Sequence, residues 1–263
     1  MSVITVEGLG KRYAGAAAPA VHDVSFTVAD REFMVLLGPS GCGKSTVLRM
    51  IAGLEPITSG TVSIDGKVVN AVPAKLRDIA MVFQSYALYP HMTVYENLAF
   101  GLRRRSIEQA EVARRVNAAA AKLGLTEFLK RKPYALSGGQ RQRVAIAQQL
   151  LCSEHFLLMD EPFSGLDVVM EAKVCELINE IACLDELNTI IVVTHDVTAA
   201  ATVADHLWLM GRDRDASGNN IPGARIQETY DLIERDMCWH PEITNSPKFL
   251  EFVREVKERF QTL

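Results

Sequence analysis

A glycine-rich run near the N-terminal end has the residue types and spacing that bind phosphate. It reads Gly38-Pro39-Ser40-Gly41-Cys42-Gly43-Lys44-Ser45-Thr46 and fits the pattern G-x-x-x-x-G-K-S/T. Glycines let successive backbone N–H groups face phosphate oxygens, and a helix beginning near Lys44 adds positive potential. We expect Lys44 to reach the β- and γ-phosphates of a nucleotide and the Ser45 hydroxyl to bind Mg²⁺. The alternative is a chance glycine-rich turn, against which the flanking strand and helix patterns argue.

Two adjacent acids follow a second apolar run. Asp160 and Glu161 come directly after residues 156–159. Neighbouring carboxylates are costly to bury without a cation, so a metal ion close by is expected. We assign Asp160 to the Mg²⁺ side and Glu161 to the general base that polarises an attacking water. The alternative is a plain acidic turn, and the phosphate loop in the same chain favours the functional interpretation.

Gln84 and His195 occupy the same position after two further apolar runs, residues 79–83 and 189–194. A neutral amide can orient a water molecule and join the shell of a metal ion, and an imidazole can hydrogen-bond to a γ-phosphate oxygen. We place both side chains with the catalytic residues, and Gln84 also with the metal ligands. A lone histidine is more often structural, but His195 follows a strand that we expect to lie beside that of Asp160.

The elements that must position these side chains alternate between strand and helix patterns. That alternation predicts a mainly parallel sheet covered by helices. The key strands are expected at residues 32–37, 79–83, 156–159 and 189–194. Ligands of open α/β sheets lie beyond the carboxyl ends of the strands, so these four ends are expected to converge on one crevice.

Helical patterns interrupt and end this alternation. Helices are predicted at residues 94–104, 107–123 and 140–151, as an inserted helical subdomain. A turn-rich cluster predicts a long surface loop over residues 211–223. A last helix, capped by Ser246 and Pro247, is expected to pack on the body of the domain rather than in a membrane. Its predicted apolar stripe is Leu250, Val253, Val256 and Phe260.

Composition narrows the choice of partners and compartment. The 263 residues are 48% hydrophobic, enough for a packed core, and the net charge of −4 gives no basic footprint for nucleic acid. The apolar runs are far shorter than the roughly 20 residues of a membrane span, and the N-terminus has no signal-peptide pattern. We expect a cytoplasmic protein without a nucleic-acid partner.

The five cysteines have no paired short spacing, which argues against a zinc site or a disulfide framework. Cys42 is the exception of interest, because it lies in the phosphate loop near a helix N-terminus. That position predicts a lowered thiol pKa and a reactive side chain. A spectator thiol is the alternative.

A third motif, together with the features above, indicates a known family. It reads Leu136-Ser137-Gly138-Gly139-Gln140. Ser137 and Gln140 fit a helix capping box, and the two glycines leave amides bare for an anion. A cap alone is the alternative. In this order, after a phosphate loop and ahead of an acidic strand end, the motif resembles the LSGGQ signature of ATP-binding-cassette (ABC) proteins, and the likeness extends over residues 3–210.

The resemblance implies a P-loop NTPase with an N-terminal antiparallel β region and an inserted helical subdomain that carries the signature. It implies one ABC ATPase domain over 1–263, with a core of 1–84 and 152–210, a helical subdomain of 85–151 and a C-terminal loop and helical tail of 211–263. ATP and Mg²⁺ are the implied cofactors.

The family pattern also assigns roles to residues. Tyr13 is implied to stack on adenine, Gln84 to form the Q-loop, Asp167 to belong to the D-loop, and His195 to be the switch histidine. In the family, two chains enclose two ATP molecules head to tail. Ser137, Gly138, Gly139 and Gln140 are therefore implied to act in trans, across a dimer that is expected to be a homodimer.

Residues 77–104 resemble the ATPases of bacterial solute importers, the sugar-uptake group especially. In that family this region receives the coupling helix of a separate permease. The implied function is ATP-driven dimer closure coupled to solute import, on the inner face of the membrane, with a solute-binding protein acting through the permease.

The chain departs from the sugar-importer pattern in three respects. About fifty residues after Met210 are too few for the extra C-terminal regulatory domain. Gln148 stands where the family usually has arginine. Glu154-His155 stands where the family more usually has a turn that contains proline. The tail is slightly more similar to importers of anions such as nitrate or sulfonates, so the class of solute stays open.

Two other functions are the alternatives to a transport ATPase. A soluble ABC ATPase acting on DNA or ribosomes typically has a long coiled-coil insertion or a second cassette, and this sequence has neither. A degenerate nucleotide-binding scaffold is the other alternative. The intact Lys44, Asp160, Glu161 and His195 argue against it.

Overall fold

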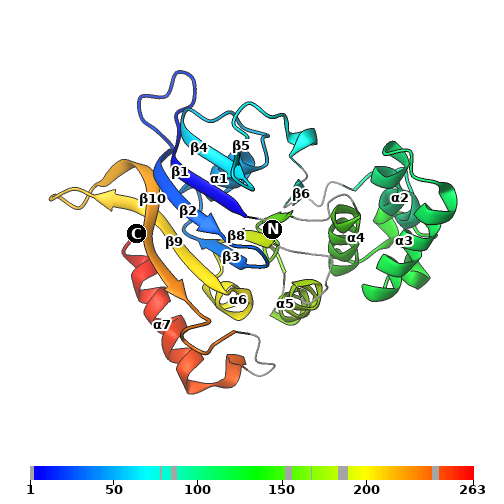
Figure 1. The fold of residues 1–263 in the computed structure, drawn as a ribbon. Coiled ribbons are helices and arrows are strands. Elements are labelled where there is room, and N and C mark those ends of the chain that lie inside the picture. The colour runs from blue at the N-terminus through cyan, green and yellow to red at the C-terminus, as the bar shows by residue number, and fades with distance from the viewer. Residues whose placement is uncertain are drawn as a thin grey trace.

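The computed structural model describes residues 3–77, 79–83, 88–151, 156–166, 168–182, 189–238 and 243–263. Within these ranges ten strands form one sheet, in the order β5-β4-β1-β2-β10-β9-β3-β8-β7-β6 (Figure 1). The strands are β1 (Ile4–Lys11), β2 (Val21–Val28), β3 (Phe33–Leu37), β4 (Ser59–Ile64), β5 (Lys67–Val68), β6 (Ile79–Val82), β7 (Phe156–Asp160), β8 (Thr189–Thr194), β9 (His206–Arg214) and β10 (Asn220–Asp231). Strands β9, β3, β8, β7 and β6 are parallel, whereas β5, β4, β1 and β2 are antiparallel. The predicted fold class is confirmed.

The burial of each strand follows its sequence pattern. β2 alternates buried and exposed side chains, as an antiparallel strand with one solvent face does. β3, β7 and β8 are buried at every position, as expected of central parallel strands with covered faces. The four predicted key strands are confirmed to within one residue at each end.

Each face of the sheet has its own hydrophobic core, because successive residues of a strand point to opposite faces. Met34 and Leu36 of β3 pack with helix α1 and the antiparallel strands. Phe33, Val35 and Leu37 pack in a second core with the remaining helices. The helices are α1 (Lys44–Ile51), α2 (Val94–Arg104), α3 (Gln109–Lys122), α4 (Gly138–Leu150), α5 (Val168–Ala182), α6 (Val197–Val203) and α7 (Pro247–Gln261).

The predicted helical insertion is confirmed as α2, α3 and α4. In Figure 1, α4 lies between the α2–α3 pair and the sheet, and it contacts both α2 and β6. Helix α4 begins at Gly138, earlier than predicted, because Ser137 caps it. Helix α2 has the predicted bounds and begins with a capping box formed by Thr93 and Glu96.

The prediction of a long surface loop over residues 211–223 is wrong. Most of this segment belongs to the β9–β10 hairpin, and β10 also pairs with β2 in parallel through Ala224 and Val21. The turn-forming residues occupy the hairpin tip, where the Asp215 carboxylate accepts hydrogen bonds from the N–H groups of Ser217 and Asn219. Turn composition marked the tip, but its flanks are mostly polar, glycine or proline and have no apolar strand pattern, although they belong to strands that pair across a short turn.

The last helix is confirmed, with Ser246 as its cap and Pro247 at its first position. Its predicted stripe is partly wrong. The buried face is formed by Phe249, Phe252, Val253 and Val256, while Leu250 is 58% exposed. Among the residues that the structure describes, no helix has the length and apolar character needed to cross a membrane.

Candidate functional site

The phosphate loop links the end of β3 to the start of α1. Gly43 is the N-cap of α1 in a left-handed conformation, with φ of 108°, and no side chain caps the helix. The first amides of α1 therefore face outward without a side-chain acceptor. Gly38 has no room for a side chain, because a Cβ there would lie 2.3 Å from the carbonyl oxygen of Met210. The backbone thus forms the tight, amide-rich turn that the motif predicts.

Lys44 lies folded into this loop and is buried. Its Nζ donates hydrogen bonds to the carbonyl oxygens of Gly38 at 2.8 Å and Pro39 at 3.2 Å. The same ammonium lies 3.4 Å from Oε1 of Glu161. The loop lysine and the acid that follows β7 are therefore already paired.

Ser45 and Asp160 form the second contact between the loop and β7. The Ser45 hydroxyl donates to Oδ1 of Asp160 at 2.6 Å, and Arg49 lies 3.5 Å from Oδ2. Within the described part of the chain, no group of three or more His, Cys, Asp or Glu side chains could hold a metal ion by itself. A hydroxyl and one carboxylate fit Mg²⁺ held jointly with phosphate and water, because Mg²⁺ keeps few protein ligands in nucleotide sites. Ser45 and Asp160 are the residues present that would hold it.

Glu161 bridges Lys44 and His195. Its Oε2 lies 2.8 Å from Nδ1 of His195 and accepts a longer bond from the His195 backbone N–H at 3.3 Å. The Glu161 backbone is left-handed, with φ of 52°, and its N–H donates to the carbonyl of Val193. This turn brings the carboxylate to the ends of β3 and β8, so the predicted convergence is confirmed for three of the four strand ends, those of β3, β7 and β8.

For Cys42 the structure favours the spectator thiol over the reactive one. The side chain is only 4% exposed and packs in the core with α1 and the antiparallel strands. Burial raises the pKa of the thiol, and this outweighs the opposite effect of the Lys44 charge. The sequence placed the thiol near positive charge but gave no information on whether it faces the core.

The signature motif caps α4 as expected. The Ser137 N–H donates to Oε1 of Gln140 at 2.9 Å, and the Gln140 N–H donates to the Ser137 hydroxyl at 3.3 Å. Around Gly138 there is open space where a Cβ would be. The amide end of α4 is therefore open to an anion.

Tyr13 lies beside the start of α1. Its hydroxyl is 3.2 Å from Oγ1 of Thr46, and the Lys11 ammonium is 5.0 Å from its ring centroid. The side chain is 43% exposed, so a ring face is available for stacking. The predicted residues Gln84 and Asp167 lie outside the described residues, and their roles stay predictions, as do those of the other site residues.

The sequence analysis missed two residues that contact site residues or their immediate neighbours. Arg49 lies one turn after Ser45 on α1 and forms an ion pair with the Asp160 carboxylate at 3.5 Å. Gln142 of α4 donates from Nε2 to the carbonyl of Pro162 at 2.5 Å. Helical spacing from Ser45 could have indicated Arg49. No local pattern indicates Gln142.

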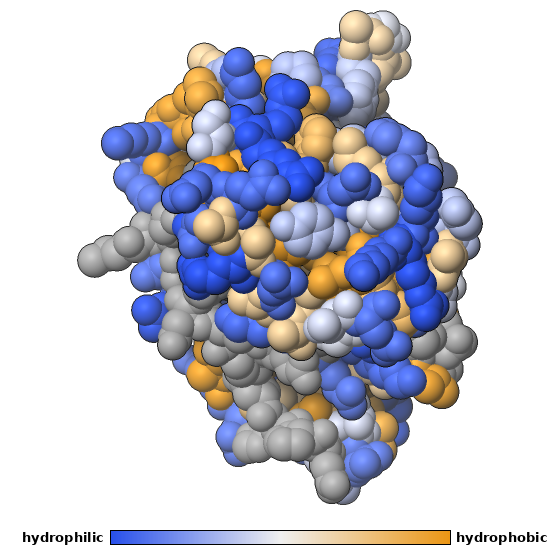
Figure 2. All heavy atoms as spheres, turned by 90° about the vertical axis from the view of Figure 1, so that its right-hand side faces the viewer, coloured by the Kyte–Doolittle hydropathy of each residue, from blue (hydrophilic) through white to orange (hydrophobic). Residues whose placement is uncertain are grey.

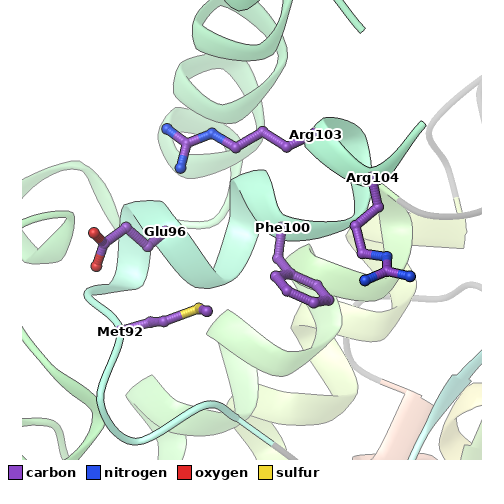
Figure 3. Close-up of a pocket in the computed structure, with 5 residues that line it drawn as sticks. All are labelled: Met92, Glu96, Phe100, Arg103 and Arg104. Carbon is purple, nitrogen blue, oxygen red and sulfur yellow. The ribbon is translucent and has the colours of Figure 1, made fainter. Parts of the chain in front are cut away.

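A pocket of about 300 Å³ lies on the helical subdomain, away from the phosphate loop. Its lining residues come from α2 and the segment before it: Met92, Glu96, Phe100, Arg103 and Arg104 (Figure 3). Figure 2 shows the side of the molecule that includes this subdomain, where polar side chains predominate and apolar ones are exposed between them.

Comparison with known sequences gives consistent relatives. A family model described as "ABC transporter" matches residues 21–164. The "Multiple sugar-binding transport ATP-binding protein MsmK" of Streptococcus mutans is 47% identical over 232 residues, covering 87% of this chain and 60% of that protein. The "Oligosaccharides import ATP-binding protein MsmX" of Bacillus subtilis is 51% identical over 214 residues, covering 80% of this chain and 57% of that protein. The chain spans about three fifths of the length of these relatives.

Comparison with solved structures supports the same fold. The structure described as "Dimeric structure of a post-hydrolysis state of the ATP-binding cassette MJ0796 bound to ADP and Pi" superposes with a TM-score of 0.72 at 28% sequence identity. The match covers 87% of this chain and 98% of that chain.

Proposed function

The chain belongs to the ABC transporter family, and on that premise we propose that it hydrolyses ATP with Mg²⁺ as a homodimer and drives a membrane permease. The observation that carries the ATPase proposal is the contact set at the strand ends. Lys44, Glu161 and His195 form one chain of contacts, and Ser45 and Asp160 form a second beside it. Phosphate binding, metal binding and proton acceptance each have a fitting group within this one site.

Glu161 is restrained until a nucleotide arrives. One of its oxygens faces Lys44 and the other faces His195. Phosphate oxygens compete for the Lys44 ammonium, so nucleotide binding draws Lys44 away from Glu161 and frees Oε1 to accept a proton from the attacking water. Bound Mg²⁺ supplies charge neutralisation at the phosphates. His195 stays on the other carboxylate oxygen and orients the base.

The ATPase proposal is tested by phosphate release from the purified chain with Mg²⁺ and ATP. Lys44→Ala should abolish turnover and weaken ATP binding, because it removes the only loop cation expected at the phosphates. Lys75→Ala is the matched control, since Lys75 is exposed and remote in sequence from the loop. Equal activity of the Lys44→Ala variant and the wild type contradicts the assignment.

The partner proposals rest on the relatives. MsmK and MsmX carry names that state sugar and oligosaccharide transport. By similarity we propose that this chain sits on the cytoplasmic face of the membrane, bound to a permease that imports a sugar or an oligosaccharide delivered by a solute-binding protein. Co-purification of the permease, and ATPase stimulation by candidate sugars in the reconstituted complex, tests this part.

The pocket on α2 supports a docking place for the permease. The Phe100 ring packs against the Tyr89 ring at a tilt of 45°, with the ring centroids 4.6 Å apart, and points to the same side of α2 as Arg104 (Figure 3). Glu96 is the acid in the lining, and it accepts hydrogen bonds from Thr93, which lower its pKa. The lining therefore keeps an apolar surface and an excess of positive charge. A permease helix that presents an apolar side chain and an acidic one fits both features.

Charge reversal tests this docking place. The double variant Arg103→Glu, Arg104→Glu should lose the permease in co-purification while keeping its basal ATPase activity. Arg114→Glu, on the neighbouring helix α3, is the control for a change of surface charge. Retention of the permease by the double variant contradicts the docking proposal and leaves the ATPase proposal standing.

A further inference from the structure

Gln142 joins the signature helix to the segment that carries the general base. It lies on the second turn of α4, five residues after Ser137, and its side chain is fully buried. Its Nε2 donates to the carbonyl oxygen of Pro162, the residue directly after Glu161, at 2.5 Å. Its Oε1 has no hydrogen-bond partner among the residues that the structure describes.

The turn that Gln142 holds is a strained one. Glu161 has a φ of 52°, and a residue with a Cβ adopts such a conformation only where its surroundings impose it. The Glu161 N–H donates to Val193 of β8, and the Ser164 N–H donates to the Glu161 carbonyl. The bond from Gln142 to Pro162 adds a third restraint, and it is the one that comes from α4.

Packing alone does not explain a glutamine at this position. A buried amide with an unpaired oxygen costs folding free energy, whereas an apolar side chain of similar size fills the same space without that cost. Helix α4 lies between α2 and the sheet in Figure 1, so an apolar residue suits the site. We therefore attribute the amide at position 142 to the hydrogen bond that it donates to the Pro162 carbonyl.

We propose that Gln142 is a positioning residue that couples the signature of each chain to Glu161 of the same chain. The inference rests on the proposed head-to-tail dimer, in which the signature of one chain meets the nucleotide of its partner. Engagement of the signature moves α4, and Gln142 passes that movement to Pro162 and hence to the Glu161 carboxylate. Each site therefore becomes fully active when the other site is also occupied, and hydrolysis is cooperative in ATP.

The test is the ATP dependence of hydrolysis by the Gln142→Met variant. Methionine keeps the volume and loses the donor. Because displacement of a catalytic group by about 1 Å costs up to about 100-fold in rate, we expect kcat to fall 10- to 100-fold. The ATP affinity, measured without turnover, should change less than twofold, and the Hill coefficient should fall to about 1. Gln148→Met is the matched control, since Gln148 is also buried on α4 and its Oε1 also has no partner among the described residues.

A second variant separates positioning from general destabilisation. In Gln142→Glu, burial raises the pKa of the new carboxyl, and only the protonated acid can donate to the Pro162 carbonyl. The ratio of its kcat to that of the wild type should therefore rise as pH falls. A purely structural role predicts no such rescue.

The outcomes discriminate between the two proposals. Cooperative wild-type hydrolysis with unchanged kcat and Hill coefficient in Gln142→Met overturns the coupling and leaves the ATPase proposal intact. Loss of kcat in Gln148→Met equal to that in Gln142→Met also overturns it. Non-cooperative wild-type hydrolysis contradicts the proposed dimer, and the coupling fails with it.

Discussion

Asn97 fixes the segment that forms one wall of the pocket on α2. Its side chain is fully buried and accepts a hydrogen bond from the Tyr89 N–H at 2.8 Å. Its Nδ2 donates to the carbonyl oxygens of Tyr89 at 3.1 Å, Met92 at 3.3 Å and Thr93 at 2.9 Å. The Asn97 side chain on α2 therefore binds the start of the segment 89–93 at Tyr89 and its end at Met92 and Thr93.

The Asn97→Ala substitution removes all of these bonds at once. Each net hydrogen bond contributes about 1 kcal/mol, and buried groups left without a partner cost about 1–3 kcal/mol, although water reaches part of this segment. We expect the free energy of unfolding to fall by about 3 kcal/mol. At about 2–4 °C per kcal/mol for a chain of this size, Tm should fall by about 6–12 °C.

Urea unfolding measures the free energy, and hydrogen exchange of the Tyr89 amide reports the local effect. Asn70→Ala is the control, because the exposed Asn70 side chain makes two similar bonds, to Val62 and Gly60, where water can replace it. That variant should lose about 1 kcal/mol or less. A loss below 1 kcal/mol in Asn97→Ala, with unchanged exchange at Tyr89, refutes the assigned role of Asn97.

Three further predictions concern the nucleotide site and the tail. Tyr13→Ala should raise KM for ATP about tenfold by loss of base stacking, while Tyr13→Phe should not, and a steady-state titration decides this. Cys42 should react with iodoacetamide more slowly than a free thiol, with or without ATP, because burial raises its pKa; rapid alkylation in the folded protein contradicts that. The hydrogen bond from Arg259 lowers the pKa of Glu228 in the folded protein. This ion pair therefore stabilises the fold above the ordinary glutamate pKa of about 4.3, and the stabilisation is lost as pH falls through the lowered pKa of Glu228. Glu228→Gln should therefore flatten the acid side of a Tm–pH profile, and an unchanged profile contradicts the role of this pair.

The sequence predicted those parts of the fold that local patterns determine. Continuous apolar runs identified the central strands, and the capping box of Ser137 and Gln140 is present as expected, although α4 begins two residues before the predicted start. The β9–β10 hairpin was missed because residues 211–214 and 220–223 are mostly polar, glycine or proline and lack the apolar alternation that predicts strands, although they belong to strands that pair across a short turn. The buried face of α7 was misassigned at Leu250 because apolar spacing alone cannot say which of two adjacent stripes faces the core.

The candidate site divides in the same way. Lys44, Ser45, Asp160, Glu161 and His195 were predicted together because each follows a strand of one parallel sheet, and topology brings such ends to one edge. Burial and long-range hydrogen bonds were not predictable, since no local pattern encodes them. The thiol of Cys42, for which a reactive and a spectator role were both left open, and the amide of Gln142, which was not noticed, are the two examples.

The Glu161→Gln variant tests the central claim most directly. The amide cannot accept a proton from water, but the phosphate loop and the signature are untouched. ATP should therefore bind and convert the variant to a stable dimer in size-exclusion chromatography, while phosphate release stays at the level of Lys44→Ala. Hydrolysis by Glu161→Gln at the wild-type rate would contradict the account, because Glu161 would then not be the general base.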